Sequence, residues 1–120
     1  MSVFSRLFQR SEPVADRWVE PRELVAKLAA AQAPLILDVR GPDEFTGPLG
    51  HIAGARNLPL DALAAELPGL VAQGNAIVAI CKTDRRSAAA ARLLRDAGAT
   101  EVSVLRGGME GWNALGLPIA

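Results

Sequence analysis

Two apolar runs do most to limit what this chain can fold into. Leu35–Val39 (apart from Asp38) and Ala76–Ile80 are each as long as a typical strand, and both lack the alternation of apolar and polar residues that marks a half-buried strand. A strand that is apolar on both sides is buried on both faces, as in a parallel sheet covered by helices. The two runs therefore predict an α/β fold with a mostly parallel central sheet and helices on both of its faces.

The rest of the chain alternates between strand-like and helix-like segments. Further short strands are predicted at residues 17–19, 55–58 and 102–105. Helices are predicted at residues 21–28, 61–67, 87–97 and 109–115, with at most a short one at 43–45 in the turn-rich stretch 41–54. Pro68-Gly69 is expected to end the second of these helices, because proline cannot complete the helical hydrogen bonding.

Composition excludes several classes of partner. Thirteen basic and thirteen acidic residues cancel, so the chain lacks the basic surplus of a nucleic-acid-binding protein. No apolar run approaches the ~20 residues of a membrane span, and the N-terminus lacks the apolar core of a secretory signal. A single cysteine cannot form an internal disulfide, which suits a reducing, cytoplasmic location. One histidine and one cysteine, far apart in sequence, make no metal-ligand cluster, and no organic cofactor is implied.

Residues 1–16 are expected to form a tail or a short amphipathic helix that precedes a single domain at 17–120. One face of such a helix carries four apolar residues, Val3, Phe4, Leu7 and Phe8. This face either packs on the domain or belongs to a frayed terminus, or it docks on a partner or a membrane surface.

Cys81 stands where the second apolar run ends and a helical segment begins. The carboxyl ends of strands in open α/β sheets form crevices that bind ligands. The amides of residues 82–86 can curl around an anion or a thiolate if Ser87 caps the following helix, and Arg85 and Arg86 add positive charge. Cys81 is therefore either a nucleophile that faces an anionic or sulfur-bearing substrate, or a small buried hydrophobe at a strand end.

The loop from Cys81 to Ser87, followed by an alanine-rich helix, resembles the active-site loop of the rhodanese (sulfurtransferase) family. Three further stretches match this family in order: Leu37-Asp38-Val39-Arg40 with Glu44-Phe45, Gly50-His51-Ile52-Ala53-Gly54-Ala55-Arg56-Asn57-Leu58-Pro59, and Leu105-Arg106-Gly107-Gly108-Met109 with Trp112, Gly116 and Pro118. The likeness covers about residues 18–119. Each motif alone is weak, but four in the family's order are specific.

The resemblance implies a single-domain rhodanese-like fold and sulfur transfer in two displacement steps. Cys81 would take a sulfane sulfur from thiosulfate or a persulfide donor, and pass it to a thiophilic acceptor such as cyanide, glutathione or a protein thiol. The substrate-binding residues would be those that follow it: Lys82, Thr83, Asp84, Arg85, Arg86 and Ser87. The alternative within the family is a non-catalytic persulfide carrier, or a protein-binding, sulfur-sensing module.

Loop length separates sulfur chemistry from phosphate chemistry. The related tyrosine phosphatases of the cell-cycle type have a loop one residue longer, whereas four residues separate Cys81 from Arg86 here. The shorter ring suits sulfur transfer and leaves a phosphatase as a minor alternative. Asp84 stands where the family often has glycine, so its carboxylate is expected either to pair outward with Arg85 or to disfavour thiosulfate. The Gly107-Gly108 pair would let backbone approach this loop closely.

Residues outside the loop are expected to support it. His51, the only histidine, is predicted to belong to a structural turn, because a thiolate stabilised by amide dipoles needs no general base. Arg40 is predicted to form a buried or half-buried ion pair with Asp38 or Glu44. Trp112 is predicted to pack in the core with its N–H bonded nearby.

Overall fold

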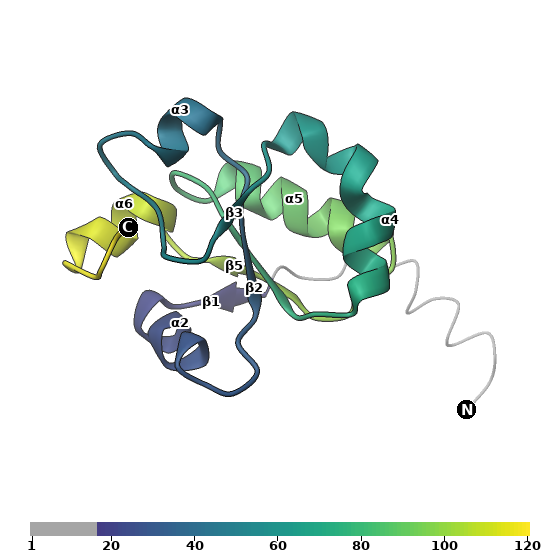
Figure 1. The fold of residues 1–120 in the computed structure, drawn as a ribbon, viewed down its shortest axis with the longest axis horizontal. Helices are drawn as coiled ribbons and strands as arrows, with labels where there is room; N and C mark the ends of the chain where they lie inside the picture. The colour runs from purple at the N-terminus through teal and green to yellow at the C-terminus, as the bar shows by residue number, and fades with distance from the viewer. Residues whose placement is uncertain (1–16) are drawn as a thin grey trace.

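Five parallel strands form one sheet in the computed structural model, which describes residues 17–120. They are β1 (Trp18–Val19), β2 (Leu35–Asp38), β3 (Arg56–Asn57), β4 (Ile77–Ile80) and β5 (Val102–Leu105), in the spatial order β1-β5-β4-β2-β3 (Figure 1). The predicted parallel α/β sheet is confirmed. Residues 1–16, and with them the expected amphipathic segment, lie outside the described residues.

Helices cover both faces of the sheet, as predicted. Their bounds are α2 (Pro21–Leu28), α3 (Pro42–Phe45), α4 (Leu63–Gln73), α5 (Arg85–Asp96) and α6 (Gly108–Ala114), with a 3-10 turn, η1 (Leu60–Ala62), before α4. α4 and α5 pack on one face through Leu63, Leu70 and Leu94, and α2 and α6 pack on the other through Leu24 and Trp112 (Figure 1). Within residues 17–120, no helix has both the length and the apolarity to cross a membrane.

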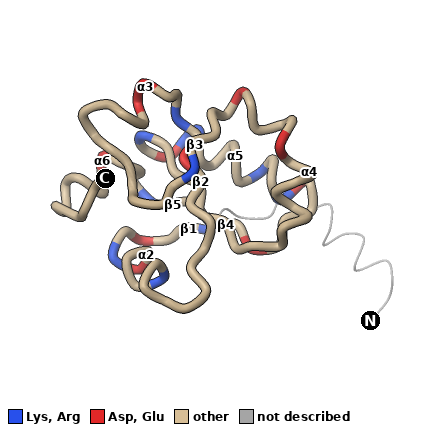
Figure 2. Tube along the Cα trace, viewed as in Figure 1, with Lys and Arg blue, Asp and Glu red and all other residues tan. Residues whose placement is uncertain are grey.

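β4 is the central strand and the most deeply buried. Its four residues are at most 2% exposed, and neither β4 nor β5 carries a charged residue (Figure 2). Ile77 and Ala79 belong to the core under α4 and α5, while Val78 and Ile80 belong to the core under α2 and α6. A slip of one residue would exchange the two faces, so this packing fixes the position of Cys81, which follows directly.

The topology opens a crevice at the end of β4. The strand order reverses between β2 and β4, which are neighbours in the sheet. After β2 the chain continues to β3 on one side of this pair, and after β4 it continues to β5 on the other side. Ligands bind at such a reversal, outside the carboxyl ends of the strands. The loops that leave these two strands begin with Val39 and Arg40 after β2 and with Cys81 after β4. The fold thus brings two of the sequence motifs to one edge of the sheet.

Several helix boundaries differ from the prediction by a residue or two, and the end of α4 differs by more. α4 continues through Pro68 to Gln73 instead of ending at Pro68-Gly69. A proline inside a helix costs about 3 kcal/mol, and burial of Leu63 and Leu70 offsets this, since each contributes about 1.5–3 kcal/mol. α5 begins at Arg85, with Asp84 at the N-cap position, so the prediction of Ser87 as the cap is wrong.

Candidate active site

Cys81 lies at the carboxyl end of β4, and its residue is only 1% exposed. Its Sγ is 3.2 Å from Oγ of Ser87, which is fully buried in the first turn of α5. The Ser87 hydroxyl also reaches the carbonyl oxygen of Asp84 at 3.2 Å. The hydroxyl has one proton, so it can donate either to this carbonyl or to the sulfur, and a thiolate would compete for it.

A pocket of about 470 Å³ lies over the thiol. It is lined by one side chain from η1, the loop after β4 and the first turns of α5: Leu60, Cys81, Lys82, Thr83, Arg85, Arg86 and Ala89. Four of the six residues predicted to bind substrate are therefore part of its wall. The other two, Asp84 and Ser87, do not line it. Three of the residues that line the pocket are cationic, namely Lys82, Arg85 and Arg86, which favours anionic ligands.

The loop amides are arranged as the start of a helix requires. The Asp84 carbonyl accepts the first N–H bond of α5, from Ala88 at 3.0 Å. In the described part of the chain, none of the amides of residues 82–87 donates to a backbone carbonyl. Amides left without acceptors at a helix start can bind an anion. Their position next to Cys81 is consistent with the expected cradle.

Asp84 does not form the expected ion pair with Arg85. Its Oδ1 instead accepts the backbone N–H of Gly107 at 2.8 Å, in the turn that leads into α6. The reason is proximity: a Cβ added to Gly108 would lie 2.4 Å from the carbonyl oxygen of Cys81, so these two backbones are in direct contact. The prediction that the glycine pair allows a close approach to this loop is confirmed.

Arg86 is held by a carboxylate from the neighbouring loop. Its Nη1 and Nη2 donate to Oε1 and Oε2 of Glu44 in α3, at 2.7 and 2.8 Å. The hydrogen bonds from the guanidinium outweigh desolvation and lower the pKa of Glu44 to about 2. The same bonds raise the pKa of Arg86. This partner was not identified from the sequence, where Glu44 is considered only for Arg40.

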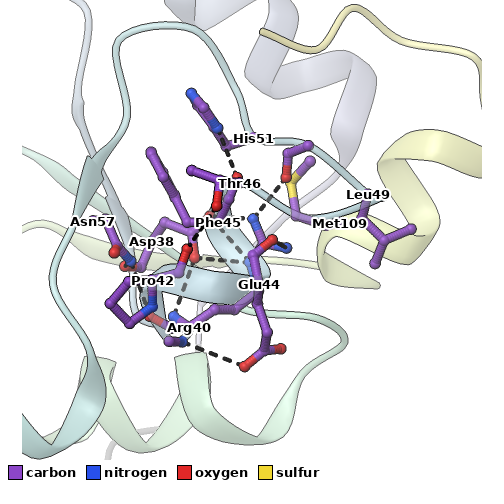
Figure 3. Close-up of polar contacts among 12 residues, drawn as sticks. Asp38, Arg40, Pro42, Glu44, Phe45, Thr46, Leu49, His51, Asn57 and Met109 are labelled. Atoms are coloured by element: carbon purple, nitrogen blue, oxygen red, sulfur yellow. Dashed lines mark hydrogen bonds and ion pairs between the residues drawn. The ribbon is translucent and has the colours of Figure 1, made fainter.

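Arg40 forms the predicted buried ion pair, and its partner is Asp38. Both side chains are 1% exposed, with Nε and Nη2 of Arg40 at 2.9 and 2.8 Å from the two carboxylate oxygens. The remaining guanidinium donors reach the carbonyl oxygens of Glu44 at 3.1 Å and Gly50 at 2.8 Å (Figure 3). Arg40 thus ties the end of β2 to α3 and to Gly50 in the segment that follows, and it positions the α3 backbone that presents Glu44.

Residues 20–115 match the Rhodanese-like domain family. The chain belongs to the rhodanese family. It is 40% identical over 77 residues to YqhL of Bacillus subtilis, which covers 64% of this chain and 59% of that protein. A protein of Allochromatium vinosum named sulfurtransferase is 30% identical over 101 residues, covering 84% of this chain and 92% of that protein. A rhodanese-related protein of Thermoplasma volcanium has the same fold, with a TM-score of 0.75 and 28% identity over 87% of this chain and 97% of that one.

Membership in the rhodanese family supports sulfurtransferase activity in general terms. The chain spans little more than half the length of some of its curated relatives, such as the 59% of YqhL, so it carries at least the rhodanese part of such proteins. In the rhodanese fold the motifs recognised in sequence converge on one site. Cys81 follows β4, the Asp38–Arg40 pair ends β2, and Gly107 leads into α6.

Two residues have the supporting roles predicted for them. Nδ1 of His51 donates to the carbonyl oxygen of Phe45 at 2.8 Å, and the two rings stack at 3.7 Å (Figure 3). Trp112 is 2% exposed, and its Nε1 donates to the carbonyl oxygen of Pro118 at 2.8 Å. Among residues 17–120 no group of three or more His, Cys, Asp or Glu side chains could hold a metal ion.

Proposed function

We propose that this protein moves a sulfane sulfur through a persulfide on Cys81. The observation that carries the proposal is the buried thiol beneath a pocket walled by Lys82, Arg85 and Arg86. Three cations favour a thiolate, and they also attract an anionic sulfur donor. A thiol nucleophile works in a reducing compartment, so we expect the cytoplasm as its location.

The first step loads the cysteine. The Cys81 thiolate attacks the outer sulfur of thiosulfate, or the sulfane sulfur of a persulfide such as that of glutathione. The new Sγ–S bond forms as the old S–S bond breaks, and sulfite or a thiolate leaves with the electron pair. Amides of residues 82–86 would stabilise the charge on the terminal sulfur, because backbone N–H groups at a helix start favour an anion.

The second step unloads it. An acceptor nucleophile (cyanide, glutathione or a protein thiol) attacks the terminal sulfur and forms thiocyanate or a new persulfide. The Sγ–S bond then breaks and returns its electron pair to Cys81 as thiolate. Two displacement steps through one covalent intermediate predict ping-pong kinetics.

A persulfide carrier that turns over slowly on small molecules is the second candidate. The observation that favours it is the bidentate Glu44–Arg86 pair, which neutralises one of the three pocket cations. A less charged donor, or a persulfide presented by another protein, would then load Cys81 better than thiosulfate does. Such a module would bind a protein partner instead of a small substrate.

Mass spectrometry separates the candidates. After incubation with thiosulfate or glutathione persulfide, we expect an adduct of about 32 Da on Cys81 in the folded protein. Loss of the adduct on addition of cyanide or glutathione, with steady turnover, supports the enzyme; an adduct without turnover supports the carrier. Absence of any adduct would refute both.

Cys81→Ser is the matched variant, because it exchanges one atom at a buried position. We expect it to abolish sulfur transfer with little change in the thermal midpoint, since the hydroxyl is a far weaker nucleophile than the thiolate. Transfer and stability are measured on the same preparation. A large drop in stability with transfer retained would instead assign Cys81 a purely structural role.

A further inference from the structure

The loop that carries Cys81 is bonded to the first turn of α6. The N–H of Met109 donates to the carbonyl oxygen of Cys81 at 2.9 Å, and the N–H of Glu110 donates to the carbonyl oxygen of Lys82 at 3.0 Å. These are the amides that a helix start leaves without partners of its own. The active loop therefore fills the hydrogen-bonding needs of α6, and α6 fixes two successive carbonyls of the loop.

Fixing the carbonyls also fixes the amides. A peptide unit is planar and trans, so its C=O and its N–H point in opposite directions. Because the carbonyls of Cys81 and Lys82 point to α6, the N–H groups of Lys82 and Thr83 point away from it. These two amides, which follow Cys81 directly in the chain, are thus oriented by a helix that begins more than twenty residues later.

Asp84 adds a side-chain bond to this contact. Its Oδ1 accepts the Gly107 N–H at 2.8 Å, and Gly107 is the N-cap residue of α6. Gly107 and Gly108 both have positive φ, +79° and +56°, so the turn has a backbone shape that other residues adopt poorly. The hydrogen bond from this turn to the Asp84 carboxylate keeps the Cys81 loop in a fixed position relative to the turn.

We propose that Asp84 is a positioning residue: its carboxylate fastens the Cys81 loop to the start of α6 and thereby holds the loop amides in the orientation that stabilises a thiolate or persulfide. The proposal deepens the sulfur-transfer function and rests on it for the persulfide. It also assigns the carboxylate a role that removes it from the pocket wall, where its charge would oppose an anionic donor.

Two variants separate the hydrogen bond of Asp84 from its charge. Asp84→Asn keeps an oxygen that can accept the Gly107 N–H, whereas Asp84→Ala has none; both lack the negative charge. Every other charge around the thiol is the same in the two variants: Lys82, Arg85 and Arg86 in the loop and helix α5, Glu44 in α3, the Asp38–Arg40 pair after β2, and Arg106 and Glu110 around the start of α6. Any difference between the variants reports the bond.

The first measurement is the thiolate absorbance of the single cysteine as a function of pH. We expect a thiol midpoint about one pH unit higher in Asp84→Ala than in Asp84→Asn, because the alanine variant no longer orients the amides that favour the thiolate. Persulfide formation with glutathione persulfide should be about tenfold slower in Asp84→Ala and within about twofold of the parent rate in Asp84→Asn.

Equal midpoints and equal rates in the two folded variants would overturn the positioning role. If the parent protein forms no persulfide while the two thiol midpoints still differ, the proposed function fails and the positioning role stands. Should Asp84→Ala fail to fold, hydrogen exchange of the Gly107 amide decides: slow exchange in the parent and in Asp84→Asn supports the bond, and fast exchange in the parent refutes it.

Discussion

Gly108→Ala probes how closely the active loop and α6 must approach. A Cβ at this position would lie 2.4 Å from the carbonyl oxygen of Cys81 and 2.5 Å from that of Thr83. A Cβ contact shorter than 3.0 Å is not sustained, so the two backbones must separate by at least 0.6 Å, the difference between 3.0 and 2.4 Å. The hydrogen bond from Met109 to Cys81, 2.9 Å long, would then stretch to the limit of a hydrogen bond.

The magnitude follows from three effects. A φ of +56° costs an alanine about 1–2 kcal/mol. Overpacking against backbone that cannot rotate away costs a further 1–3 kcal/mol or so, and each weakened hydrogen bond about 1 kcal/mol. We expect the free energy of unfolding to fall by about 3–6 kcal/mol. Displacement of a catalytic loop by somewhat less than 1 Å should lower the rate of persulfide formation by about 10²-fold in molecules that remain folded.

Gly116→Ala is the matched control. Its φ is +67°, and a Cβ there meets nothing within 4 Å, so it has the conformational cost without the clash. We expect a loss of about 1–2 kcal/mol and an unchanged transfer rate. Urea denaturation gives the free energies, and single-turnover loading followed by mass spectrometry gives the rates. Equal rates for Gly108→Ala and the parent protein would refute the idea that this contact orients the loop.

Two other predictions concern the ion pairs. Because the folded pKa of Glu44 is depressed to about 2, its pairing with Arg86 stabilises the protein above pH 4.5, and this stabilisation is lost as the pH falls from there through 2. Both side chains are more than a third exposed, so urea denaturation should show about 1 kcal/mol more acid destabilisation in the parent than in Glu44→Gln. Identical pH curves for the two proteins would contradict the pairing. Arg40→Met should lower the unfolding free energy by about 3–5 kcal/mol, because it leaves Asp38 charged and buried. Asp38→Asn combined with Arg40→Met should recover part of that loss, and a double variant less stable than the single one would contradict this explanation.

The parts of the site that depend on local pattern were predictable from sequence. β4 is a continuous apolar run, α5 is alanine-rich, and Cys81 stands between them, so the thiol at a strand end follows from residues that are neighbours in the chain. The buried ion pair of Arg40 is also local, although the sequence left both Asp38 and Glu44 open as its partner. Patterns of this range are set by secondary structure alone.

The pairings between distant loops were not predictable. Glu44 and Arg86 are 42 residues apart, and Asp84 and Gly107 are 23 apart. For each charged group the sequence offers several partners whose electrostatic energies differ little, and only the folded loops decide among them. The continuation of α4 through Pro68 has a similar cause, because the burial of Leu70 that offsets the proline is a tertiary effect.

The pairing of Arg86 bears on which donor the pocket favours. No ion pair within residues 17–120 occupies Lys82 or Arg85, so these two cations remain to attract a donor, whereas Arg86 already has two hydrogen bonds to Glu44. An anion that sought Arg86 would have to displace a carboxylate whose geometry is bidentate, the strongest arrangement for a guanidinium. A singly charged or protein-borne persulfide needs no such exchange. Loading by thiosulfate should therefore be hindered by the Glu44–Arg86 ion pair more than loading by glutathione persulfide is. The ratio of the two loading rates is accordingly a direct readout of this ion pair.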